Sequence, residues 1–593
     1  MAQNNNTDVH SFAQPQKAYI THLNLNLEAD FDNKILKGKA TLEYKNIAQT
    51  SQIHLDTRDL DILQITQNNQ PIKFQLTEPK EYLGQALIID INPQLNQGTL
   101  TIEYQTHPQA AALQWLTPEQ TAGKKNPFLF TQSQAILART WVPCQDSPGI
   151  RFTYTATIKT PKNLMAVMSA QNPQIKNSEG IYQFEMKQPI PAYLLALAIG
   201  DFEFAPLGER TGVYAENNTL EKAKYEFAEL ENMLQLAEKL YGKYEWERYD
   251  LIVLPPSFPF GGMENPRITF ATPTIIAEDR SLISLVAHEL AHSWSGNLVT
   301  NATWNDFWIN EGFTVYFERR IMEAMMGKSY AEMLAYLGYQ DLLHTLELFG
   351  KDNPDTRLKL DLKDRDPDEG VSEIAYEKGY FFLITLEKKV GRPKFDAFLH
   401  QYFQKNAFQG MDTEKFLEYL KKELPETQTI DLNAWIYQPG LPSNFALTLP
   451  ERFIEVEKQL KKWKNGTPPE KLNTQQWTTH EWLHFIEQLP AEISTDELEK
   501  LDQQFKFSQS GNAEIITQWL QITLPLSYTP AFAPAENFLM NVGRRKFLVP
   551  IYKAMLKTEQ GTQKAKEIYQ KARKNYHSVA TNTLDKLILE QQR

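Results

Sequence analysis

Residues 288–292 read His288-Glu289-Leu290-Ala291-His292, and Glu311 follows nineteen positions after the second histidine. On an α-helix, residues four apart lie on one face about 6 Å apart, so both imidazoles can bind the same metal ion. Zinc held by two histidines and one carboxylate keeps a fourth position for water, and Glu289 would stand beside that water. The spacing therefore predicts a zinc metallopeptidase.

The same pattern occurs a second time, as His480-Glu481-Trp482-Leu483-His484. Here Thr478 and the glutamate have the spacing of a capping box, in which the glutamate folds back onto the start of the helix. The position nineteen after the second histidine is Gln503, a poor zinc ligand. We interpret the two histidines of this copy as helix-surface residues and assign the metal site to the first copy.

The surroundings of the first copy favour this assignment. Residues 282–290 are apolar on almost all sides, as expected of a buried helix. Glu311 lies within a second apolar stretch, residues 307–313, which opens after Asn305-Asp306. A carboxylate inside an apolar helix needs a partner, and a divalent cation is a suitable one.

Composition sets broad limits on partners and location. The 593 residues carry a formal net charge of −12, which argues against nucleic acid as a partner. Cys144 is the single cysteine, so the metal site must use nitrogen and oxygen ligands. The amino terminus lacks the pattern of a secretory signal, and the longest apolar run, residues 190–200, is too short to cross a bilayer. We expect a cytoplasmic protein with no membrane partner.

Sequence periodicity predicts an α+β protein with several domains. Apolar residues alternate with polar ones through residues 1–204, which predicts a β-rich domain of antiparallel strands. Residues 205–438 mix short strands with helices, including one long helix from Leu220 to Tyr241 that Gly242 ends. A proline-rich linker is expected at 439–455, and an all-helical domain at 456–593.

Further motifs resemble a known family. Gly261-Gly262-Met263-Glu264-Asn265 upstream of the zinc motif resembles the zinc aminopeptidases of the aminopeptidase N superfamily. The stretches 254–260 and 543–547 look most like the leukotriene A4 hydrolase branch of that group. The resemblance implies a saddle-shaped β domain, a thermolysin-like catalytic domain and an armadillo-like helical domain that enclose a cleft. It also implies one Zn²⁺ per chain. We expect the protein to be a monomer.

The resemblance assigns a role to each site residue. Glu264, helped by Gln134, would bind the free amino terminus of a short peptide, and Tyr376 would donate a hydrogen bond to the developing oxyanion. Paired glycines let an extended substrate approach a strand edge closely. The full set comprises the ligands His288, His292 and Glu311, the base Glu289, the oxyanion donor Tyr376, the amine-binding residues Gln134 and Glu264, the substrate-backbone residues Gly261, Gly262 and Met263, and the carboxylate-binding pair Arg544 and Lys546, which would favour tripeptides.

Two other functions remain open from the sequence. Asp368 matches the carboxylate with which the leukotriene A4 hydrolase branch places water for opening a lipid epoxide. However, Val371 and Phe260 stand where tyrosines would be expected for that chemistry. A binding scaffold with structural zinc is the third possibility, although structural zinc sites have four protein ligands and this one offers three.

Overall fold

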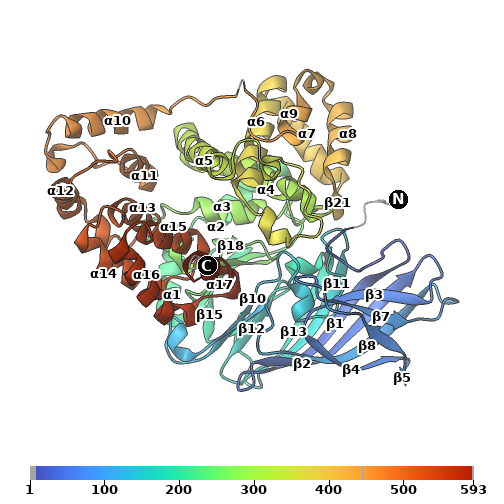
Figure 1. Ribbon diagram of the computed structural model, residues 1–593. Helices are drawn as coiled ribbons and strands as arrows, with labels where there is room; N and C mark the ends of the chain where they lie inside the picture. The colour runs from blue at the N-terminus through green and yellow to red at the C-terminus, as the bar shows by residue number, and fades with distance from the viewer. Residues whose placement is uncertain (1–7, 444, 590–593) are drawn as a thin grey trace.

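The computed structural model describes residues 8–443 and 445–589. Its three parts follow one another along the chain: a β-rich part, a middle part of mixed strands and helices, and a helical part (Figure 1). In Figure 1 the red helices of the last part lie against the middle part on one side, and the blue sheets lie below the metal-motif helices. The predicted fold class is confirmed.

The β-rich part consists of three sheets. The largest has seven strands in the order β13-β11-β1-β2-β8-β4-β5, and sheets of three strands (β3-β7-β6) and four strands (β12-β14-β10-β9) accompany it. The strands are β1 (Ala18–Asp30), β2 (Ile35–Asn46), β3 (Gln52–Thr57), β4 (Leu60–Gln67), β5 (Gln70–Pro71), β6 (Phe74–Leu76), β7 (Gln85–Asp90), β8 (Gln97–Thr106), β9 (Leu113–Leu116), β10 (Phe128–Thr131), β11 (Phe152–Lys159), β12 (Met165–Met168), β13 (Ile181–Ile190) and β14 (Leu197–Gly200).

Apolar and polar residues alternate along strands such as β1 because one face of the sheet is buried, as predicted. On β1, Leu23, Leu25 and Leu27 are all buried, while the residues between them are exposed or half-buried. Successive side chains on a strand point to opposite faces, so one apolar face packs into the core. Pairing in this part is antiparallel except between β1 and β11, which run parallel.

The middle part is built on a five-stranded sheet in the order β15-β16-β17-β19-β18, with helices beside it. A two-stranded sheet joins β20 to β21. Its elements are β15 (Phe202–Pro206), β16 (Thr211–Glu216), α1 (Asn217–Glu226), α2 (Leu230–Tyr241), β17 (Tyr249–Val253), β18 (Gly262–Met263), β19 (Ile268–Ala271), α3 (Ser284–Ala291), β20 (Val299–Asn301), α4 (Phe307–Met326), α5 (Lys328–Phe349), α6 (Gly379–Val390), α7 (Arg392–Lys405), β21 (Gln409–Met411), α8 (Thr413–Glu423) and α9 (Leu432–Ile436).

The single long helix predicted from Leu220 to Tyr241 is wrong. The structure has two helices, α1 and α2, because the chain leaves the helical conformation at Phe227 and a new helix begins at Leu230. No glycine or proline marks the break, so apolar spacing alone does not show it. Gly242 does end α2, with φ of 98° in the left-handed region that favours glycine.

Within the described residues, the last part contains helices and no strands. Its α-helices are α10 (Glu451–Lys464), α11 (Thr479–Glu487), α12 (Thr495–Phe505), α13 (Ala513–Thr523), α14 (Phe532–Asn541), α15 (Arg545–Met555), α16 (Glu559–Ala572) and α17 (Ser578–Ile588). The domain limits at 204, 438 and 455 stay predictions; β15 spans the first, and α10 starts before the last. Across residues 8–443 and 445–589, no helix has the length and apolar character needed to span a membrane.

Candidate active site

Helices α3 and α4 bring the three predicted ligands together. His288 lies in the last turn of α3, His292 directly follows that helix, and Glu311 lies in the second turn of α4. The Nε2 atoms of the two histidines are 3.2 Å apart, and Glu311 Oε2 lies 3.3 Å from His288 Nε2 and 3.5 Å from His292 Nε2. The Glu311 carboxylate therefore meets the two imidazoles at one point, although Glu311 lies nineteen positions after His292 in the sequence.

This arrangement fits a tetrahedral zinc ion. Ligand atoms that each lie about 2.0–2.1 Å from such an ion are about 3.3 Å from one another, which matches the observed spacing. Both histidines use the opposite ring nitrogen for other contacts: His288 Nδ1 lies 3.1 Å from Glu318 Oε2, and His292 Nδ1 lies 3.0 Å from the Ser295 carbonyl. Such contacts orient the rings and leave Nε2 for the metal. Glu311 Oε2 is buried without a hydrogen-bond partner.

Glu289 lies between this triad and the glycine motif. A Cβ atom added at Gly262 would come within 2.3 Å of the Glu289 carboxyl group, so glycine is needed where the strand passes this side chain. Glu289 Oε2 is buried and has no hydrogen-bond partner. Burial raises the pKa of Glu289 to about 8, because a carboxylate in an apolar site loses its hydration.

Glu264 is a second unpartnered carboxylate beside the triad. It is buried, and its Oε1 makes no hydrogen bond. Ligand atoms of Glu264, Glu289 and His292 all lie within 4.8 Å of one another. Burial and the nearby carboxylates of Glu311 and Glu289 raise the pKa of Glu264 well above its usual range. Its backbone is fixed by Asn297, whose side-chain amide donates to the Glu264 carbonyl at 2.7 Å.

The triad opens into a cavity of about 350 Å³. Tyr376 lines it from a π-helical turn at Ile374–Lys378, with its ring 6.1 Å from the ring of His288 and nearly parallel to it. Gln134 lines it from the β-rich part. The cavity therefore lies between domains, which is a common place for a ligand site.

Of two further predicted substrate-binding residues, Asp368 lines the cavity and Met263 does not. Asp368 lines the cavity, and burial raises its pKa to about 7, an effect that the nearby Ala135 N–H opposes. Met263 is not among the lining residues; its side chain is buried and accepts a hydrogen bond from Gln132 Nε2 at 3.2 Å.

Arg544 and Lys546 also line the cavity, at the start of α15. Arg544 is buried, with a guanidinium 2.6 Å from where a Cβ of Gly261 would lie. Lys546 is more exposed, and its ammonium donates to both carboxylate oxygens of Glu514 at 2.9 and 3.0 Å. A substrate carboxylate would share Lys546 with this internal acid.

Sequence reasoning missed Glu318 and Glu514. Glu318 follows Glu311 by seven positions, which places it two turns further along the same face of α4. That spacing could have identified Glu318 from the sequence. Glu514, on α13, is thirty-two positions before Lys546, and no local pattern connects the two residues.

The second histidine motif has the predicted cap but not the predicted exposure. The Glu481 carboxylate accepts the Thr478 N–H at 2.9 Å, as expected of a capping box. However, His480 and His484 are buried rather than on the helix surface. Phe453 of α10 stacks on the His484 ring at 4.3 Å, and Tyr330 of α5 contacts the His480 ring, so neighbouring helices cover this face.

Comparisons with known proteins agree with this site. Residues 19–194 match the peptidase M1 N-terminal domain, 225–435 the peptidase family M1 domain, and 477–588 the leukotriene A4 hydrolase C-terminal domain. The chain is 36% identical to leukotriene A-4 hydrolase of Xenopus laevis, over 96% of this chain and 97% of that protein. It is also 36% identical to leucine aminopeptidase 2 of Aspergillus terreus, over 95% of both chains.

Solved structures give the same result. The structure of yeast leukotriene A4 hydrolase in complex with bestatin matches with a TM-score of 0.92 and 33% identity, over 99% of this chain and 98% of that chain. A zinc metallopeptidase of the M1 family from Deinococcus radiodurans matches in fold, with a TM-score of 0.59 and 24% identity over 75% of this chain and all of that chain. The chain therefore belongs to peptidase family M1, in the group with a leukotriene A4 hydrolase C-terminal domain, and is a zinc aminopeptidase.

Proposed function

We propose that this enzyme removes the amino-terminal residue from short peptides, with one Zn²⁺ held by His288, His292 and Glu311. The observation that carries the proposal is Glu264, a buried carboxylate without a partner beside the triad. A buried charge needs a counter-charge, and the ammonium group of a free peptide amino terminus supplies one. An internal peptide bond has no such group, so the site favours the end of a chain.

The residues divide the chemistry between them. When bound, Zn²⁺ would polarise the scissile carbonyl and make a water molecule more acidic. Glu289, whose Oε2 is free, accepts the proton of the attacking water and passes it to the leaving amine. Gly261 and Gly262 leave room for the substrate backbone, and Gln134 assists Glu264 with the amine. Tyr376 donates to the oxyanion that forms at the carbonyl.

The proposal is tested with an aminoacyl anilide and its N-acetylated form, assayed before and after treatment with a chelator. We expect the free-amine substrate to be hydrolysed much faster than the acetylated one, with loss of about 99% or more of this activity on chelation and its recovery with one equivalent of Zn²⁺. Equal hydrolysis of the acetylated substrate would contradict the role of Glu264. Full activity in metal-free protein would contradict the zinc site.

Replacement of Tyr376 by phenylalanine should lower kcat by about 10²–10³-fold and leave KM nearly unchanged, because the lost donor acts only in the transition state. Steady-state kinetics with an aminoacyl anilide measure both constants. Tyr339, which lies on α5 and is not among the cavity-lining residues, provides the matched control, and its phenylalanine variant should retain kcat. A higher KM at unchanged kcat in the Tyr376 variant would assign the tyrosine to ground-state binding instead.

Replacement of Arg544 by alanine should raise KM for a tripeptide by about tenfold or more, because a buried guanidinium pairs strongly with a carboxylate. The same change at Lys546 should have a smaller effect, since this side chain is more exposed and lies 2.9 Å from the Glu514 carboxylate, whereas Arg544 is 3.8 Å from it. An aminoacyl anilide has no carboxylate and provides the control substrate. Equal KM increases for both substrates would argue against carboxylate binding.

Hydrolysis of a lipid epoxide is the second candidate function. Asp368 lines the same cavity, and a carboxylate there could place water for epoxide opening. Val371 and Phe260 also line it and offer no hydroxyl group, which favours peptides. Incubation with a leukotriene epoxide and analysis of the products separates the two functions, because an enzymatic diol is expected only from the epoxide activity. The monomeric state and the cytoplasmic location stay predictions.

A further inference from the structure

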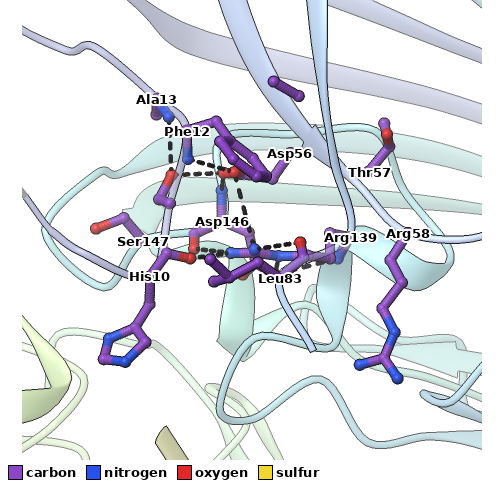
Figure 2. A network of polar contacts seen from close by, with 12 residues as sticks. His10, Phe12, Ala13, Asp56, Thr57, Arg58, Leu83, Arg139, Asp146 and Ser147 are labelled. Carbon is purple, nitrogen blue, oxygen red and sulfur yellow. Dashed lines mark hydrogen bonds and ion pairs between the residues drawn. The ribbon is translucent and has the colours of Figure 1, made fainter. Parts of the chain in front are cut away.

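A buried polar network in the β-rich part is not used by the proposed chemistry. Its centre is Arg139, a fully buried side chain (Figure 2). The Arg139 guanidinium donates to the Asp146 carboxylate at 3.0 Å and to the carbonyls of Leu83 and His10 at 2.9 and 2.7 Å. A buried charge with this many partners holds the segments that supply them in fixed positions.

Asp56 holds the same amino-terminal segment from the other side. Its carboxylate accepts the Phe12 N–H at 2.7 Å, the Asp146 N–H at 2.8 Å and the Ser11 hydroxyl (Figure 2). Residues 10–12 are therefore joined to the interior of the β-rich part through both their backbone and a side chain.

The ring of His10 connects this network to the middle part. His10 is 1% exposed, and its Nε2 lies 3.0 Å from the Leu362 carbonyl and 3.2 Å from the Arg365 carbonyl. Both partners are acceptors, so Nε2 carries a proton and donates. The segment that His10 holds leads directly into the turn at Pro367–Gly370 that presents Asp368.

That turn and the Gln134 segment meet at the cavity. The Asp366 carboxylate accepts the Asp368 N–H at 3.0 Å and so fixes the start of the turn. The Ala135 N–H faces the Asp368 carboxylate, and Gln134 and Asp368 both line the cavity. Arg139 follows Gln134 by five positions, so the network holds the Gln134 segment directly. It holds the turn that carries Asp368 through His10.

We propose that His10 is a positioning residue for substrate binding. Its Nε2–H fixes the 362–368 segment, and through it Asp368, relative to the neighbouring Gln134 segment. Residues 10–12 thus act as a clasp between two domains that each contribute one wall of the cavity. The inference rests on the proposed function, because it concerns the part of the cavity where Gln134 would bind the peptide amine.

The test measures kinetic constants for an aminoacyl anilide. His10→Ala should raise KM by about tenfold and change kcat by less than about twofold, since the walls shift while Glu289 and the triad stay in place. His10→Gln should restore KM, because the glutamine amide N–H can replace Nε2–H. His10→Asn, whose amide is too short to reach the two carbonyls, should not. This pair keeps the test informative if the alanine variant does not fold.

Two controls distinguish positioning from general destabilisation. His22 is a matched histidine on β1 whose ring contacts Thr153 and Thr155, and His22→Ala should leave KM unchanged. In an Asp368→Asn background, His10→Ala should have little further effect, because both changes act on one element. An unchanged KM in His10→Ala, or an undiminished rise in that background, would overturn the inference. An inactive wild-type enzyme would instead refute the proposed function.

Discussion

Replacement of Glu289 by glutamine should lower kcat for an aminoacyl anilide by about 10²–10⁴-fold, the range of a general base. Glutamine has nearly the same shape, so it fits beside Gly262, but its amide cannot accept the proton of the attacking water. Because the triad of His288, His292 and Glu311 is unaltered, zinc should remain stoichiometric. Steady-state kinetics and elemental analysis on the same sample measure the two effects.

The second histidine motif offers a matched control for this experiment. Glu481 has the same place in the pattern as Glu289, but its carboxylate accepts the Thr478 N–H and pairs with Arg452. Glu481→Gln should leave kcat unchanged and lower the unfolding free energy by about 0.5–2 kcal/mol through the weakened helix cap. Wild-type turnover in Glu289→Gln, or loss of zinc from it, would contradict the assigned role.

The zinc ligands were predictable because their geometry is largely local. His288 and His292 share a helix face through their spacing, and Glu311 lies in the next helix of a buried pair. The strands were predictable for a similar reason, since alternation along β1 follows from the burial of one face. Local periodicity therefore predicted the strands and the two helices that carry the zinc ligands, whereas the saddle-shaped, thermolysin-like and armadillo-like character of the domains was predicted from the family resemblance.

Features that depend on distant contacts were not predictable from one sequence. The prediction that His480 and His484 are exposed is wrong, because Phe453 and Tyr330 from other helices cover them. The pairing of Glu514 with Lys546 joins two helices, and no spacing rule relates them. The contact of His10 with Leu362 spans most of the chain. Each depends on how elements pack, which propensity and periodicity do not specify.

Replacement of Glu264 by glutamine should lower kcat/KM for a free-amine substrate by about 10²-fold or more, because the loss of one partner of a buried charge pair costs about 2–5 kcal/mol. The N-acetylated substrate has no ammonium group, so its hydrolysis should not fall. The ratio of the two kcat/KM values therefore measures the contribution of Glu264 to selectivity for chain ends.

The size of this effect follows from where the charge lies. Glu264 is buried with a free oxygen next to two other carboxylates, so an incoming ammonium group relieves repulsion as well as forming a new pair. Glu373 is a matched control, since it lines the same cavity but lies outside the cluster of Glu264, Glu289 and Glu311 around the histidines. Glu373→Gln should therefore keep the preference for a free amine. An equal loss of preference in both variants would mean that the overall negative charge of the cavity, rather than Glu264, selects the amino terminus.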